Sequence, residues 1–156
     1  KIFQDKTVRQ IIEAVLAVQP QSPLDLARRV AAVETFLRLP QAVALAAANK
    51  RIGNLLKKSA QADAGALDAS LFVEPAEQQL GAALLRLEQT AADSDISADY
   101  GAWLAQLAAL HDPVNAFFDS VLVMAEDPAL RENRLRLLAK LQRLFLRVAD
   151  IGLISS

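Results

Sequence analysis

Cysteine is absent from this 156-residue sequence, and histidine occurs once, as His111. The chain therefore has neither a disulfide framework nor a thiolate metal site, and one histidine excludes a histidine-based metal cluster. Aromatic residues make up only 5% of the chain, and there are five glycines. No segment approaches the roughly 18 consecutive apolar residues of a membrane-spanning helix. We expect no metal site and no contact with a membrane.

The motifs of common catalytic sites are also missing. The sequence has no glycine-rich phosphate loop, no G-x-S-x-G nucleophile elbow, no H-E-x-x-H pair and no cysteine nucleophile. Two carboxylate pairs, Glu126-Asp127 and Asp93/Asp95, lie at predicted helix ends or in loops, where capping and solvation explain them. We expect no catalytic residue and no cofactor in this chain.

The N-terminus begins at Lys1, without an initiator methionine and without the pattern of a signal peptide. We therefore expect a cytoplasmic protein, and we interpret the sequence as a fragment of a longer chain. A length of 156 residues is typical of one domain with a sizeable core, so residues 1–156 are predicted to form a single domain.

Apolar residues, mainly alanine and leucine, make up 53% of the chain and recur at helical spacing. No segment alternates with the two-residue period of a strand, and no repeat of solenoid length is visible. The fold class is therefore all-α, a bundle of about seven helices. Residues 60–73 have no clear period and are predicted to form a loop. Helices are predicted near residues 7–18, 22–38, 40–59, 74–93, 97–111, 113–125 and 128–148.

Helix starts are marked by side-chain acceptors followed by proline. Asp112-Pro113 and Asp127-Pro128 each place an acceptor at the N-cap and a proline at the first helical position. Ser22 to Asp25 resembles a capping box, and Ser97 is a candidate cap for the fifth helix. His111 is expected at the C-terminal end of that helix, in a structural role. The two helices of the last third have wide apolar faces, so the rest of the chain is predicted to pack against them.

Charge is distributed unevenly along the chain. The first 59 residues carry ten Lys or Arg against four Asp or Glu, residues 60–99 carry one against eight, and residues 100–156 carry six of each. The net charge of −1 gives no overall basic footprint for nucleic acid. The basic N-terminal part nevertheless favours a negatively charged partner there, although ordinary surface variation would give the same pattern.

The third predicted helix carries a polar arc without an acidic residue. On a helical wheel its members fall within roughly 120° of one another, opposite the apolar side. Cations on a rigid helix can hold phosphates, so RNA contact is one interpretation and a solvated helix face is the other. Gly53 lies beside the arc, where either helix packing or the close approach of an RNA backbone would explain a glycine. The arc consists of Lys50, Arg51, Asn54, Lys57 and Lys58.

A second basic stripe runs along the last predicted helix. Because Glu132 stands four residues before Arg136, this stripe is interpreted mainly as a solvated face. The stripe consists of Arg136, Lys140, Arg143 and Arg147.

The first turns of the same helix hold Arg131, Asn133 and Arg134. They are weaker candidates for RNA contact. Arg134 could instead pair with Asp119 or Glu126 and fix the preceding turn. Just upstream, Phe117 and Phe118 could stack on bases, but their helical spacing favours the core.

Several blocks resemble the C-terminal end of the β subunit of bacterial tetrameric glycyl-tRNA synthetase. They are FFDSVLVMAEDPALRENRLRLL (117–138) followed by LFLRVADI (144–151), and upstream AAANKRIGNLLKK (46–58) and EPAE (74–77), in the same order. The sequence departs from the family pattern at Asn115, where Asp is common, and at Gly53 and Gly152, where Ser is common. None of these departures removes a charged candidate for RNA contact.

The resemblance implies an all-helical anticodon-binding domain of the DALR-like type. It also implies a parent enzyme that uses ATP to join glycine to its tRNA, with the chemistry in the α subunit. This chain would then hold the anticodon arm of glycine tRNA and assemble with the catalytic α subunit. Two alternatives stay open: the related C-terminal domain of arginyl-tRNA synthetase, against which the ANKRI and VADI blocks argue, and a helical protein-interaction module without RNA binding.

Overall fold

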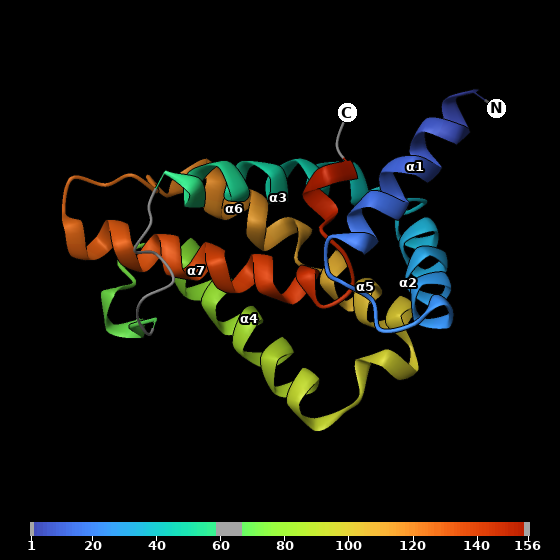
Figure 1. The fold of residues 1–156 in the computed structure, drawn as a ribbon. Coiled ribbons are helices and arrows are strands. Elements are labelled where there is room, and N and C mark those ends of the chain that lie inside the picture. Colours follow the sequence, from blue (N-terminus) through green and yellow to red (C-terminus); the bar gives the residue numbers. More distant parts are fainter. Residues whose placement is uncertain (1, 59–66, 155–156) are drawn as a thin grey trace.

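The computed structural model describes residues 2–58 and 67–154 and consists of helices in this part of the chain (Figure 1). Three short 3-10 helices are η1 (Ala69–Leu71), η2 (Ile96–Ala98) and η3 (Ile151–Ile154). The predicted all-α class is confirmed. The α-helices are α1 (Ile2–Leu16), α2 (Pro23–Phe36), α3 (Ala42–Lys57), α4 (Pro75–Asp93), α5 (Tyr100–Ala108), α6 (His111–Ser120) and α7 (Pro128–Leu146).

Helix α7 lies at the centre of the molecule, with α3 along one side of it and α4 along the other (Figure 1). The Trp103 indole N–H on α5 donates to the Leu144 carbonyl of α7 over 3.1 Å. Phe36 of α2 meets Phe145 edge-on, with ring centroids 6.2 Å apart. The prediction that the chain packs around its last third is confirmed for α7. Its buried apolar residues are Leu135, Leu137, Leu138, Ala139, Leu141, Leu144 and Phe145.

Two of the predicted helix starts have the expected chemistry. The Ser22 hydroxyl accepts from the Asp25 N–H at 3.0 Å, and the Asp127 carboxylate accepts from the Ala129 N–H at 2.9 Å. Each cap satisfies a backbone donor that the first helical turn leaves unpaired. The predicted capping box is only half formed, because the Asp25 carboxylate accepts from the Gln21 N–H, at 3.2 Å, rather than from the N–H of Ser22.

The prediction for the sixth helix is wrong at both ends. Helix α6 begins at His111, with Leu110 at its N-cap, so Asp112-Pro113 lies inside the first turn. It ends at Ser120, and residues 121–127 form a connection without regular structure. Val121, Val123 and Ala125 are buried, which is a two-residue alternation. Positions 121 and 125 are also four residues apart, so the apolar spacing is compatible with a helix as well as with an extended segment.

Two smaller expectations around α5 are also wrong. His111 starts α6 instead of ending α5, so it does not lie at a helix C-terminus. Ser97 lies in η2, and Asp99 caps α5 by accepting from the Ala102 N–H at 2.9 Å.

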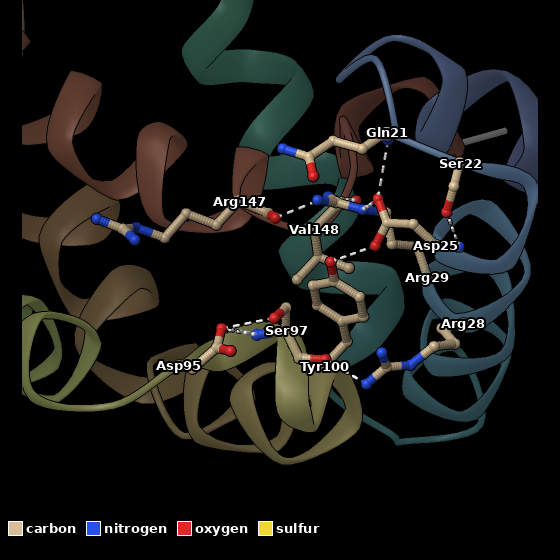
Figure 2. A network of polar contacts seen from close by, with 10 residues as sticks. All are labelled: Gln21, Ser22, Asp25, Arg28, Arg29, Asp95, Ser97, Tyr100, Arg147 and Val148. Carbon is tan, nitrogen blue, oxygen red and sulfur yellow. Dashed lines mark hydrogen bonds and ion pairs between the residues drawn. The ribbon is translucent and has the colours of Figure 1, made fainter.

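A polar network ties α2 to α5 and to the end of α7 (Figure 2). The Tyr100 hydroxyl donates to one Asp25 oxygen at 2.5 Å, and the Arg29 Nε donates to the other at 2.9 Å. Arg29 also donates to the carbonyls of Arg147 and Val148, at 2.8 and 2.9 Å, and its guanidinium lies 4.6 Å from the Tyr100 ring centre. The network closes the bundle at the end of α7 because it satisfies carbonyls that the helix leaves unpaired.

This network should make the stability of the protein depend on pH. The Tyr100 hydrogen bond, aided by Arg29, lowers the pKa of the Asp25 carboxyl. Because the folded pKa lies below the unfolded value of about 3.9, the contribution is present above that pH and is lost as pH falls through the folded pKa. We expect Asp25→Asn to flatten the decline in unfolding free energy below about pH 4, measured by urea unfolding across a pH series. An equally steep decline in Asp25→Asn would contradict this assignment.

Candidate nucleic-acid interface

The outer side of α3 and its C-cap residue, Lys58, carry the acid-free arc. All five side chains are exposed: Lys50, Arg51, Asn54, Lys57 and Lys58. The inner side of the helix is anchored by Leu45, Ala46 and Ile52, which are buried, so the outer side cannot turn inward. Helix α3 has no acidic residue in its 16 positions. The arc is therefore a fixed, exposed row of donors, as a phosphate-binding surface requires.

One hollow, of about 400 Å³, lies between α3 and the C-terminal end of the chain. Lys50, Asn54 and Lys57 line its α3 side. Gln142 of α7 supplies an amide and Asp150 a carboxylate on the opposite side. The hollow is therefore lined by both positively and negatively charged groups and by neutral amides. Gly152 forms part of its wall.

At Gly152, η3 passes close to the α3 backbone. A Cβ built on Gly152 would lie 3.1 Å from the Lys50 nitrogen and 3.2 Å from its Cα, which is tighter than ordinary contact. Gly53 is different, since a Cβ there would meet only the Gln142 Nε2, at 3.6 Å. The protein itself therefore does not require a glycine at position 53, and of the two explanations offered for it, helix packing is not supported.

A second hollow, of about 410 Å³, lies on the other flank of α3. Arg51 and Leu55 line it from α3, and the end of α6 and the 121–127 connection line it from the opposite side. The Arg51 guanidinium carbon lies 4.4 Å from the centre of the half-buried Phe118 ring. Phe117 is fully buried, as the core interpretation expects, whereas Phe118 reaches the wall of the hollow.

Arg134 of α7 has a structural role. It is 5% exposed, and its Nη2 lies 3.1 Å from Glu77 Oε1, a carboxylate that is itself 0% exposed. Its Nη1 donates to the Leu122 carbonyl at 2.6 Å. The predicted pairing with Asp119 or Glu126 is therefore wrong, because α4 brings Glu77 against the buried face of α7. A buried guanidinium cannot reach an RNA ligand.

Asn133 and Arg131 are also used inside the protein. Asn133 is 0% exposed, and its amide exchanges two hydrogen bonds with the Asp68 backbone, at 2.8 and 2.9 Å. Arg131 Nη1 donates to the Ala125 carbonyl at 3.1 Å. The first turns of α7 thus hold neighbouring segments in place. These contacts make Arg131 and Asn133 less suitable for RNA contact.

The second basic stripe is partly occupied by ion pairs. Arg136 lies 3.8 Å from Glu132, as predicted, and Lys140 Nζ lies 2.9 Å from Glu88 Oε1 on α4. Arg143 and Arg147 are exposed. Because two of its four cations are already paired with carboxylates, this stripe is a poorer phosphate-binding surface than the row on α3.

Comparison with known families identifies the domain. A model of the DALR anticodon binding domain matches residues 45–151, which begins in α3 and ends in η3. The chain belongs to the DALR anticodon-binding domain family. The exposed row of α3 and the second hollow lie inside the part of the chain that this family model covers, and the first hollow extends past its end only at Gly152 and Leu153.

The relatives with similar sequences are glycine–tRNA ligase β subunits. The one from Leptothrix cholodnii is 52% identical over 143 residues, or 92% of this chain and 20% of that protein. The one from Pseudomonas aeruginosa is 50% identical over 144 residues, covering 92% and 21%. The one from Acinetobacter baumannii is 46% identical over 153 residues, covering 97% and 22%. The chain thus spans about a fifth of the length of these relatives.

These matches confirm the resemblance stated from the sequence and favour the glycyl over the arginyl family. Four residues that line the hollows beside the arc were not predicted from the sequence: Gln142, Asp150, Leu122 and Met124. Each comes from a segment far from α3 in the chain, so no spacing rule could have placed it there. Among the described residues, no helix has the length and apolar character needed to cross a membrane.

Proposed function

We propose that this chain is the anticodon-binding module of a glycine–tRNA ligase β subunit, and that residues 1–156 form one domain of that longer protein. The observation that carries the proposal is the exposed, acid-free row on α3 inside a DALR anticodon-binding domain. The parent enzyme would attach glycine to its tRNA with ATP, in the cytoplasm. The catalytic residues would lie in the α subunit, and this domain would contribute none.

The residues of the row on α3 have two different roles in RNA binding. Lys50, Arg51, Lys57 and Lys58 present cations to the phosphates of the anticodon arm, which supply affinity without sequence information. Asn54 lies between them at the rim of the hollow that also contains Gln142. An amide can donate to and accept from a base edge, so Asn54 is the proposed reader of one loop base.

The proposal predicts which half of the tRNA binds here. We expect the parent enzyme to bind an isolated anticodon stem-loop of glycine tRNA, and a Lys50→Ala, Lys57→Ala, Lys58→Ala variant to lose that binding. The same variant should bind an acceptor-stem minihelix as the wild type does. Fluorescence anisotropy with both RNAs measures this. Equal loss for the two RNAs, or loss for neither, would contradict an anticodon-binding role for α3.

A separate expectation concerns Asn54. Asn54→Ala should reduce discrimination between the cognate anticodon and an altered one by roughly 5- to 150-fold, the range of one good base contact of 1–3 kcal/mol, while changing binding of the altered one little. Competition binding with stem-loops changed at single anticodon positions measures this. A uniform loss of affinity for every stem-loop would show that Asn54 does not read a base.

A further inference from the structure

The hollow beside Arg51 has an apolar rim that the fold of the domain does not explain. Leu122 and Met124, in the connection between α6 and α7, are 68% and 47% exposed. They alternate with Val121, Val123 and Ala125, whose burial fixes the direction of the segment and turns the two larger side chains outward. Adjacent large apolar side chains exposed at a hollow are typical of a binding surface.

This rim is held in place by hydrogen bonds from α7. Arg134 donates to the Leu122 carbonyl at 2.6 Å while pairing with the buried Glu77, and Arg131 donates to the Ala125 carbonyl at 3.1 Å. Val121 continues from α6 by donating to the Phe117 carbonyl at 2.9 Å. The segment is irregular but anchored on both sides of Met124, so Leu122 and Met124 are presented in a fixed geometry, which reduces the entropy lost on binding.

The opposite wall of the hollow supplies a flat cation. The Arg51 guanidinium lies over the Phe118 ring at 4.4 Å, and its side chain is exposed. Among the described residues, no carboxylate lies within ion-pair distance of Arg51, although Asp119 lines the same hollow. A guanidinium stacked on one aromatic ring leaves its other face available for a second planar group.

We propose that this hollow accepts one unstacked nucleobase of the bound RNA, placed against the Arg51 guanidinium and the Leu122 and Met124 side chains. Apolar contact and stacking on a guanidinium are the means by which proteins hold splayed RNA bases. Asp119 can accept a hydrogen bond from an exocyclic amino group, so the hollow favours a base that carries one. The proposal rests on the proposed function, because the phosphates held by the row on α3 bring the base within reach.

The test is a cycle that combines one change in the protein with one in the RNA. In the full-length enzyme, Leu122→Ser with Met124→Ser should weaken binding of the glycine anticodon stem-loop by roughly 5- to 150-fold, the range for one stacked base. The salt dependence should stay unchanged, because no phosphate contact is lost. Stem-loops with an abasic nucleotide at each loop position are then tested. At one loop position, the abasic change should weaken binding to the wild type by the same factor. At that position it should not weaken binding to the Leu122/Met124 variant any further.

A matched control is available in α2. Leu24 is 69% exposed, nearly the same as Leu122, and it lies outside both hollows. Leu24→Ser should leave RNA binding unchanged. A second experiment changes Asp119. Asp119→Asn should reduce the preference for cytosine over uracil at the loop position that the abasic series identifies, because cytosine presents an amino donor where uracil presents a carbonyl acceptor.

The outcomes separate this inference from the proposed function. If the Leu122/Met124 variant binds as the wild type does while the Lys50/Lys57/Lys58 variant loses affinity, the hollow is not a base site and the anticodon role stands. If the lysine variant also binds normally, both ideas fail. If the Leu122/Met124 variant loses RNA affinity equally at every abasic position, no single base occupies the hollow. If it instead loses assembly with the other synthetase subunit, measured by light scattering, the hollow is a protein-docking surface.

Discussion

Replacing Arg134 with alanine is expected to lower the free energy of unfolding by about 3–5 kcal/mol, the cost of leaving a buried charge without its partner. Glu77 is 0% exposed, and the Arg134 guanidinium is its ion-pair partner, 3.1 Å away. Arg134 also donates to the Leu122 carbonyl, so that acceptor would lose its hydrogen bond as well. Urea unfolding followed by circular dichroism measures the change.

Two further variants show whether the cause is the unpaired charge. Glu77 Oε2 and Arg134 Nε have no hydrogen-bond partner in the protein, so the pair itself is imperfectly compensated. Replacing both residues, as Glu77→Leu with Arg134→Met, should therefore cost less than Arg134→Ala alone. Arg136→Ala breaks the 3.8 Å pair with Glu132, whose side chain is 41% exposed, and should cost under about 1 kcal/mol. A double replacement as damaging as the single one would place the energy in packing and in the hydrogen bonds that Glu77 accepts from the Val73 and Glu74 N–H groups, instead of in the ion pair.

Replacing the four cations of the α3 row, Lys50, Arg51, Lys57 and Lys58, with alanine is expected to flatten the salt dependence of tRNA binding markedly. Each lost contact to a single-strand phosphate flattens the log–log slope by about 0.7, so four contacts account for about 3. Between about 50 and 200 mM salt, the wild type should therefore lose roughly 50-fold more affinity than the variant. Binding of glycine tRNA by the full enzyme across a salt series measures both slopes.

The fold should survive this change, because all four side chains are exposed and alanine is the better helix former. Since Arg51 also lines the second hollow, a variant limited to Lys50, Lys57 and Lys58 should flatten the slope by about 2 and leave base stacking intact. The matched control is the α7 stripe, Arg136, Lys140, Arg143 and Arg147, whose replacement should matter less. If that stripe carries the salt dependence instead, the RNA lies on α7 and the assignment to α3 is wrong.

The comparison of α3 with α7 illustrates what sequence patterns can predict. The exposed side of α3 followed directly from a helical wheel, because apolar and polar residues separate cleanly around it. The same reasoning failed for Asn133 and Arg134, which are polar residues on the buried face of α7. Their partners, the Asp68 backbone and Glu77, lie more than fifty residues away in the chain. A polar residue is buried only where such partners meet it, which a local pattern cannot reveal.

By itself, the sequence determined the all-α class, the central role of α7, the caps at Ser22 and Asp127, and the acid-free row on α3. The helix class, the caps and the row depend on interactions within about four residues, and the central role of α7 was predicted from the width of its apolar face. The tertiary structure decided the end of α6 at Ser120, the burial of Arg134, and the two hollows beside α3. These depend on segments that only folding brings together, because the Val121–Ala125 spacing is compatible with two periods and burial against the core selects one of them.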